Sequence, residues 1–560
     1  MIPRSKTQAL LLLSWAPLWI YTLFFRDSWP IFLISVAIAI IPPLLYHITE
    51  DTVAKKVAVA QIVFISVILQ FLLPLESGLR SLPGLDAYWE LSAFISILDS
   101  GVWNPNQLNH STVGPYPMIH ILSSQIHYIT DIPPKTIIKS ASVIMSLLIL
   151  LFIYLVARTL INGDNLIVVV MIPMPFLYQI IVPSGYGRFP LSVAYFFMFI
   201  LFLINIHRNW ERRYMYLSMI LIFPLVLSHP FTRVYSAIAA LSFSAGVVLS
   251  LKRTKIETRS KAIVGIIDPY RLVFLTLLIL SLSHIILVSF RSSNALFVVL
   301  QSLTQFGEPV VNAQANAQEF QHSILSWPSV RDYLFVYFQL LLIGMVYIIC
   351  VLGTRVYNNT MKNSVVILIT SMLLLNIPIY IFDVVNIFRF TVFFWPIAII
   401  VSAPIVSKNL GRKLLALLIV VLVVSNIAGI YPHMYDNSLP SPSSNVESPP
   451  NYDRFTKDHE RAVTKFTVFK GKILANDYYK MLLLTGPGEV YSHPKSYSNL
   501  SSLDNYDWFL VGSKDSEYIY MRSVDQQYNV TNHDRSNYQS ATHMLKVYEN
   551  GNSTAFKIPS

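Results

Sequence analysis

The stretch of sequence that decides the fold is "IIKSASVIMSLLILLFIYLVA", residues 137–157, in which Lys139 is the only charged residue. A bilayer core about 30 Å thick requires about 20 mostly apolar residues in any helix that crosses it. This run meets the requirement, and many similar runs surround it. The whole chain is 54% hydrophobic and 13% charged, with a mean hydropathy of +0.53. These values predict a polytopic membrane protein rather than several soluble domains.

Working outward from this run, the hydrophobic pattern predicts thirteen membrane spans. They cover approximately residues 8–25, 29–46, 57–73, 137–157, 166–182, 191–206, 214–228, 235–251, 272–290, 333–352, 364–382, 391–407 and 414–430. The predicted fold class is therefore an α-helical polytopic membrane bundle of about 13 transmembrane helices, followed by a small α/β domain.

Basic residues lie in short clusters in alternate connections between these spans. They are Arg4 and Lys6; Lys55 and Lys56; Arg158; Arg208, Arg212 and Arg213; Lys252, Arg253, Lys255, Arg259 and Lys261; Arg355 and Lys362; and Lys408, Arg412 and Lys413. Because cytoplasmic loops carry an excess of Lys and Arg, we predict a multi-pass cell-membrane protein with a cytoplasmic amino terminus and an extracellular carboxyl terminus. The net charge of +11 is then a topology signal and does not indicate a nucleic-acid partner.

This topology predicts three parts of the chain. Residues 1–56 form an amino-terminal transmembrane hairpin, and residues 57–430 form the main transmembrane module. The module carries two long extracellular loops, residues 74–136 and 291–332. Residues 431–560 form an extracellular carboxyl-terminal domain.

The carboxyl-terminal domain opens with a linker rich in Pro and Ser. Beyond it, "GKILANDYYKMLLLTGPGEVYS" is typical of a strand, a short helix, a turn and a second strand. "DWFLVGS" and "EYIYMRSV" predict further strands, and a closing hairpin has Asn550 and Gly551 as turn residues. The single cysteine, Cys350, lies in an apolar run, so no disulfide framework supports this domain.

Two carboxylates stand out in the first long loop, in "GLDAYWELSAF", residues 84–94. Asp86 and Glu90 share one face of a predicted amphipathic helix, since residues four apart are neighbours on a helix. Asp86 lies near the start of this helix, where the dipole favours a negative charge. The pattern fits a simple helix cap, and it also fits a catalytic carboxylate facing a cavity.

Three arginines lie at predicted outer ends of spans. They are Arg188 in "PSGYGRFP", Arg233 in "LSHPFTRVY" and Arg389 in "IFDVVNIFRF". A guanidinium group presents a planar fork that binds phosphate oxygens, so each is a candidate phosphate ligand. The alternative role for each is an interfacial anchor that reaches toward lipid headgroups.

The layout resembles the GT-C superfamily of membrane glycosyltransferases, which includes protein O-mannosyltransferases and lipid A aminoarabinose transferases. The resemblance rests on the acidic helix in the first large loop, the Pro/Tyr-containing stretch "GPYPMIHIL" and the Arg that opens the aromatic span "FRFTVFFWP". It covers roughly residues 57 to 430 in layout. The predicted extracellular sequons at Asn109, Asn499, Asn529 and Asn552 fit an archaeal cell surface.

This sequence departs from the family pattern in three ways. The acidic loop follows the third predicted span rather than the first. A single Asp86 stands with Glu90 one turn later, where many members carry two adjacent acids. The Trp-Trp-Asp signature of oligosaccharyltransferases is absent, which argues against transfer of a whole glycan to asparagine.

The resemblance implies residue roles and partners. Asp86 and Glu90 become catalytic candidates, with the choice of base between them open. The donor phosphate is assigned to Arg389, Arg233 and Arg188, and contacts with substrate to Tyr88, Tyr116, His120, His229 and Glu308. The expected partners are a polyprenyl- or dolichyl-phosphate sugar, a glycan acceptor and membrane lipid.

Histidine and carboxylate are also metal ligands. No histidine pair in the outer loops has dedicated ligand spacing. We therefore assign no metal residues and no certain cofactor, and a divalent cation stays an open alternative.

The sequence thus predicts an enzyme that moves one sugar from a polyprenyl- or dolichyl-phosphate donor to a lipid-linked or protein-linked glycan on the outer face. Two alternatives remain open: a polytopic transporter or flippase, and a non-catalytic membrane scaffold. Against transport, the polar residues concentrate at the outer ends of spans rather than at the midplane.

Overall fold

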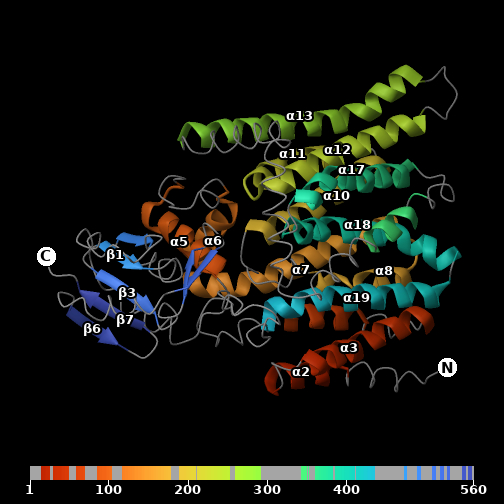
Figure 1. Ribbon diagram of the computed structural model, residues 1–560. Coiled ribbons are helices and arrows are strands. Elements are labelled where there is room, and N and C mark those ends of the chain that lie inside the picture. The colour runs from red at the N-terminus through yellow and green to blue at the C-terminus, as the bar shows by residue number, and fades with distance from the viewer. Residues whose placement is uncertain are drawn as a thin grey trace. The chain divides into compact units, whose positions relative to one another are not determined.

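The architecture is given by a computed structural model of the chain (Figure 1). The structure describes residues 14–24, 29–49, 58–69, 85–103, 116–177, 188–209, 211–251, 259–291, 342–349, 351, 360–382, 385–409 and 411–435, and the strands between 472 and 557. The chain divides into two compact units. The first comprises residues 1–72, 104–119 and 140–436, and the second comprises residues 73–103, 120–139 and 437–560.

The first unit is helical in the part that the structure describes. Its labelled helices are α2 (Trp15–Phe24), α3 (Trp29–Thr49), the greater part of α7 (Pro134–Leu160), α8 (Asp164–Met171), α10 (Arg188–Asn209), α11 (Arg212–Val226), α12 (Pro230–Leu251), α13 (Arg259–Arg291), α17 (Thr360–Phe382), α18 (Val385–Asn409) and α19 (Arg412–Tyr435). Residues 58–69 and 342–349 are also helical. Each predicted span therefore contains described helical residues.

One predicted span is not a single helix. We expected residues 166–182 to form one, but α8 ends at Met171 and a short 3-10 helix, η1, covers Met174–Phe176. Pro173 and Pro175 explain the break, since proline lacks the N–H that an α-helix interior requires. Residues 178–182 lie outside the described residues.

Within the described residues, four helices are long and apolar enough to cross a membrane: Pro134–Leu160, Phe189–Ile206, Pro269–Leu287 and Val392–Asn409. Five shorter apolar helices accompany them: Ile34–Ile48, Ala58–Leu69, Asp164–Phe176, Thr232–Val248 and Asn363–Leu374. The fold is thus a helical bundle with several apolar helices. The number thirteen stays a prediction, as does the orientation of the termini.

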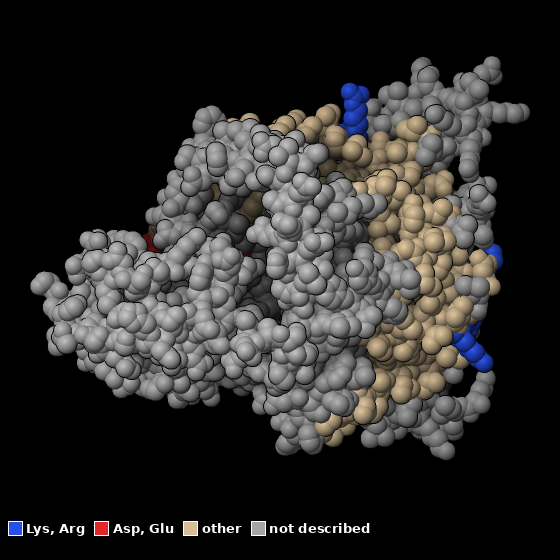
Figure 2. Space-filling view, viewed as in Figure 1, with Lys and Arg blue, Asp and Glu red and all other residues tan. Residues whose placement is uncertain are grey.

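Six exposed residues of the predicted basic clusters lie at one end of the first unit. In Figure 1 the ends of α7, α10 and α18 and the starts of α11, α13 and α19 all lie at the right-hand end of the bundle. Exposed basic side chains occupy this end: Arg158, Arg212, Arg213, Lys408, Arg412 and Lys413. Figure 2 shows a largely uncharged described surface, with Lys and Arg at its margins. The short connection between α11 and α12 lies at the opposite end.

Packing in the bundle follows from side-chain size. A Cβ added to Gly246 of α12 would lie 1.9 Å from the Oγ of Ser364 and 2.6 Å from its Cα, so glycine permits the close approach of α12 and α17. The outer face of α13 carries exposed apolar side chains, among them Leu275, Ile279 and Ile286. Such a face suits contact with lipid.

The second unit contains the strands and two helices of the first long loop. The helices are α5 (Leu85–Ser100) and α6 (Met118–Thr130), whose first two residues belong to the first unit. The strands are β1 (Lys472–Ala475), β2 (Glu489–Ser492), β3 (Trp508–Gly512), β4 (Tyr518–Met521), β5 (Gln526–Asn529), β6 (Leu545–Glu549) and β7 (Ser553–Lys557).

Five strands form one sheet in the order β2-β1-β3-β7-β6, and β4 pairs with β5. β1 runs parallel to β2 and β3, whereas β7 is antiparallel to β3 and β6. The predicted strands at "KILA", "EVYS", "DWFLVGS" and "EYIYMRSV" and the closing hairpin are confirmed. The sequence did not predict β5. The predicted helix between β1 and β2 lies outside the described residues, so the α/β domain as a whole stays a prediction.

Candidate functional site

Three helices, α10, α12 and α18, meet around one buried aromatic ring within their first three turns. Phe393 of α18 lies 5.7 Å from Phe189 of α10 and 4.7 Å from Tyr235 of α12, measured between ring centroids. Phe196, two turns further along α10, lies 5.0 Å from the same ring. Phe393 has no exposed surface. The contacts therefore place the first turn of α10 and the second turn of α12 beside the third turn of α18.

Each of these helices carries a predicted phosphate ligand close to the shared ring. Arg188 is the first residue of α10 and precedes Phe189. Arg389 lies in α18 one turn before Phe393. The side chains of Arg188 and Arg389 lie outside the described residues, so the structure places these two arginines by their backbone alone.

The side chain of Arg233 is described, and it is only 7% exposed. Its Nη2 donates a hydrogen bond of 2.7 Å to the hydroxyl oxygen of Tyr116. Its guanidinium carbon also lies 5.0 Å from the centroid of the Tyr116 ring. The Nε of Arg233 is buried and has no hydrogen-bond partner in the structure described.

Two hydroxyl groups close to Arg233 in α12 are also buried without a hydrogen-bond partner. Thr232 and Ser236 are fully buried in α12, and neither side-chain oxygen has a hydrogen-bond partner among the described residues. Burying a polar group without a partner costs about 1–3 kcal/mol. Three such groups near one helix start indicate a place that a polar ligand or water fills. Sequence reasoning missed both hydroxyls, because Thr and Ser are common in membrane helices for packing alone.

Two histidine rings lie next to the ring of Tyr116. Its ring lies 6.2 Å from that of His229 and 5.7 Å from that of His284, and His229 lies 5.1 Å from Phe189. The structure thus brings the predicted residues Tyr116, His229 and Arg233 together. His284 was missed by sequence reasoning, although a histidine inside the apolar run of α13 was a signal for it.

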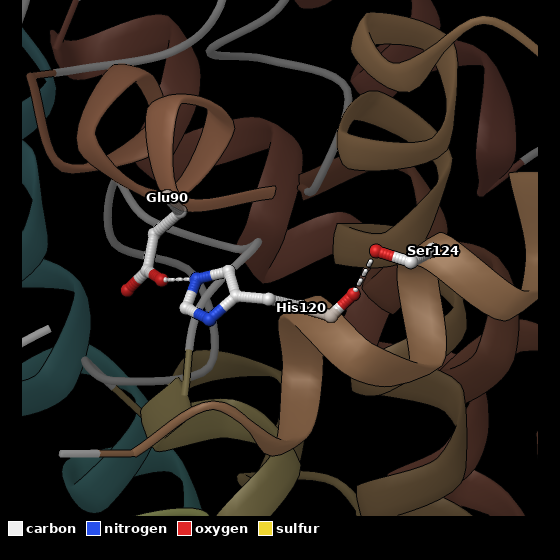
Figure 3. A network of polar contacts seen from close by, with 3 residues as sticks. All are labelled: Glu90, His120 and Ser124. Atoms are coloured by element: carbon white, nitrogen blue, oxygen red, sulfur yellow. Dashed lines mark hydrogen bonds and ion pairs between the residues drawn. The ribbon is translucent and has the colours of Figure 1, made fainter. Parts of the chain in front are cut away.

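In the second unit, Glu90 and His120 form a buried pair, 4% and 1% exposed. The Nε2 of His120 lies within hydrogen-bonding reach of the Glu90 carboxylate, as Figure 3 shows. Ser124 adds a hydrogen bond of 2.8 Å to the main-chain oxygen of His120. The predicted catalytic Glu90 and substrate-binding His120 therefore contact each other.

The remaining predicted site residues are less completely placed. Asp86 and Tyr88 lie in the first turn of α5, and their side chains lie outside the described residues, as does the whole of Glu308. No three His, Cys, Asp or Glu side chains gather as metal ligands in the described part of the chain.

The structure is similar to solved membrane glycosyltransferases. It matches the oligosaccharyltransferase of Archaeoglobus fulgidus in complex with zinc and sulfate, with a TM-score of 0.50 and 15% identity, over 82% of this chain and 68% of that one. It matches archaeal oligosaccharyltransferase AglB from Archaeoglobus fulgidus, in complex with an inhibitory peptide and a dolichol-phosphate, with a TM-score of 0.51 and 12% identity, over 85% and 74%.

A third similar structure is ArnT from Cupriavidus metallidurans bound to undecaprenyl phosphate, with a TM-score of 0.53 and 9% identity, over 89% of this chain and 97% of that one. No protein-family model and no curated protein sequence matches the chain. At these identities the likeness concerns the fold, and both kinds of protein are GT-C glycosyltransferases. The chain therefore has the same fold as these glycosyltransferases, in agreement with the resemblance in layout.

Proposed function

We propose that the protein is a membrane glycosyltransferase that moves a single sugar, a hexose such as mannose, from a polyprenyl- or dolichyl-phosphate donor to a glycan acceptor on the outer face. The acceptor glycan is lipid-linked or protein-linked. The fold supports this proposal, and structures with the same fold hold dolichol-phosphate and undecaprenyl phosphate. The observation that carries it is the meeting of three helices around Phe393, each of which has an arginine in its first two turns.

This arrangement suits a phosphate for two physical reasons. The start of a helix carries a partial positive charge and unpaired N–H groups, which bind anions. Arg188, Arg233 and Arg389 add full positive charges beside these starts. The unpartnered Nε of Arg233 and the hydroxyls of Thr232 and Ser236 supply further hydrogen-bond groups.

The reaction then needs a base for the acceptor. In the proposed step, the acceptor hydroxyl oxygen bonds to the anomeric carbon of the donor sugar, and its proton passes to the carboxylate of Asp86. The bond between the anomeric carbon and the phosphate oxygen breaks, and its electron pair leaves with the lipid phosphate. The arginines stabilise the charge that develops on this phosphate. Direct displacement inverts the anomeric carbon.

The test of the phosphate site is transfer of labelled mannose from dolichyl-phosphate mannose to a glycan acceptor by the purified protein in detergent. Arg233→Ala removes a buried cation from the proposed site and is expected to lower kcat/KM by at least about 100-fold. Arg213→Ala is the matched control, because Arg213 is exposed at the other end of the bundle and pairs with Glu211. Equal activity of the two variants would contradict the phosphate site.

A further inference from the structure

The Glu90–His120 contact belongs to a row of contacts between α5 and α6. Phe94 lies one turn after Glu90, and its ring meets that of His127 edge to face at 6.5 Å between centroids. One turn further, the main-chain oxygen of Leu98 accepts a hydrogen bond of 3.1 Å from the Tyr128 hydroxyl. Residues at this spacing share one face of α5, so the whole face is fixed against α6.

Glu90 and His120 are the buried polar members of this row. A neutral or charged imidazole donates through Nε2, and an ionised carboxylate can only accept. The Nδ1 of His120 is buried and has no hydrogen-bond partner among the described residues, so the pairing rests on Nε2. Loss of Glu90 would leave the Nε2 of His120 buried without this hydrogen bond, which is costly in a protein interior.

Asp86 lies one turn before Glu90 in α5. The row of contacts therefore ends one turn from the residue that the proposed reaction uses as base. Among the side chains that the structure describes, the Glu90–His120 pair is the member of the row that lies nearest to Asp86 in α5.

We propose that Glu90 and His120 are a positioning pair, which holds the first turn of α5 in the orientation that presents Asp86 to the acceptor, and that Glu90 is not itself the base. This inference rests on the proposed sugar transfer. It settles the choice between the two carboxylates in favour of Asp86. It also changes the role of His120 from a substrate ligand to the partner of Glu90.

A positioning role and a catalytic role of Glu90 predict different effects when its carboxylate is replaced by an amide. Glu90→Gln keeps an oxygen that accepts the bond from His120 but cannot take up a proton at pH 7. The positioning role predicts that this variant keeps at least about a third of the wild-type kcat, since the contact is retained. Glu90→Ala and His120→Ala should each lower kcat by about 10- to 100-fold, because small displacements of a catalytic group cost that much.

The measurement is sugar transfer by the purified full-length protein, with kcat and the KM for donor determined separately. Both alanine variants should lower kcat and leave the KM for donor within about twofold, because the donor phosphate binds elsewhere. The double variant should lose no more activity than either single variant, since the two residues act as one unit. Thermal unfolding of the wild type, Glu90→Ala, His120→Ala and the double variant gives a second double-mutant cycle. The decreases in Tm of the two single variants should likewise not add in the double variant.

Three outcomes overturn the inference. Loss of activity in Glu90→Gln as complete as in Asp86→Asn would make Glu90 the base. Additive losses of Tm would show that the two residues do not act as a pair. Absence of transfer by the wild-type protein would overturn the proposed function and the positioning role with it, while a coupled loss of Tm would then identify the pair as a structural contact only.

Discussion

At the scale of single residues, the start of α12 carries polar groups that have no hydrogen-bond partner in the described part of the protein. Thr232 and Ser236 are fully buried, yet their hydroxyls make no hydrogen bond in the described structure. A group kept for stability is normally paired, whereas a group kept for a ligand is paired only when the ligand is bound. Substitution can therefore distinguish a hydroxyl that stabilises the protein from a hydroxyl that binds a ligand.

We expect Thr232→Val and Ser236→Ala to raise the Tm of the donor-free protein slightly, because each removes an unpaired buried hydroxyl. The KM for donor should rise by about fivefold or more in each, for loss of one hydrogen bond to a charged phosphate. The control is Ser218→Ala, since the buried Ser218 hydroxyl donates to the Tyr214 main-chain oxygen at 2.8 Å. Ser218→Ala should lower the Tm and leave the KM for donor unchanged. The same changes in Tm and KM in all three variants would contradict a ligand at α12.

The sequence indicated many of these residues but not their partners. The sequence indicates these residues one at a time, Arg233 and His229 by their position at a predicted span end and Tyr116 by the Pro/Tyr-containing stretch. Their contacts join residues more than 100 positions apart, such as Tyr116 and Arg233, and no local pattern encodes such a pairing. Glu90 and His120 were also chosen separately, for different roles. Their contact depends on how α5 packs on α6, which only the three-dimensional structure shows.

At the scale of helices, apolar runs predicted where helices form, because length and hydrophobicity suffice to define a membrane helix. Packing between helices depends instead on shape. Gly246 is an example, because the backbone of α17 comes so close that no side chain fits. Pro173 is another, since a run that reads as one apolar span is divided by the chemistry of a single residue.

Gly246→Ala should therefore destabilise the bundle by about 1–3 kcal/mol, as expected for overpacking of a filled interior. The measurement is the thermal unfolding of the protein in detergent, followed by intrinsic fluorescence. Gly344→Ala is the matched control, because a Cβ there meets no atom within 4 Å. Equal Tm values for the two variants would show that α12 and α17 do not approach as closely as described.

At the scale of the whole molecule, the exposed basic side chains and the proposed donor site lie at opposite ends of the helical unit. The exposed basic side chains at the ends of α7 and α18 and the starts of α11 and α19 lie at one end, and the cluster of Tyr116, His229 and Arg233 lies at the other. Basic loops face the cytoplasm in most membrane proteins. This arrangement supports the proposal that the enzyme uses its lipid-phosphate donor at the outer face.

The most direct test of this account is transfer of labelled mannose from dolichyl-phosphate mannose to a glycan acceptor by the purified protein. The wild type, Asp86→Asn and Asp99→Asn are compared side by side. Asp99 is the matched control, since it is an exposed carboxylate in the same helix, α5. The account predicts transfer by the wild type and by Asp99→Asn, and a loss of at least about 100-fold in Asp86→Asn, the contribution of a general base. Full activity of Asp86→Asn, or no transfer by the wild type, would contradict it.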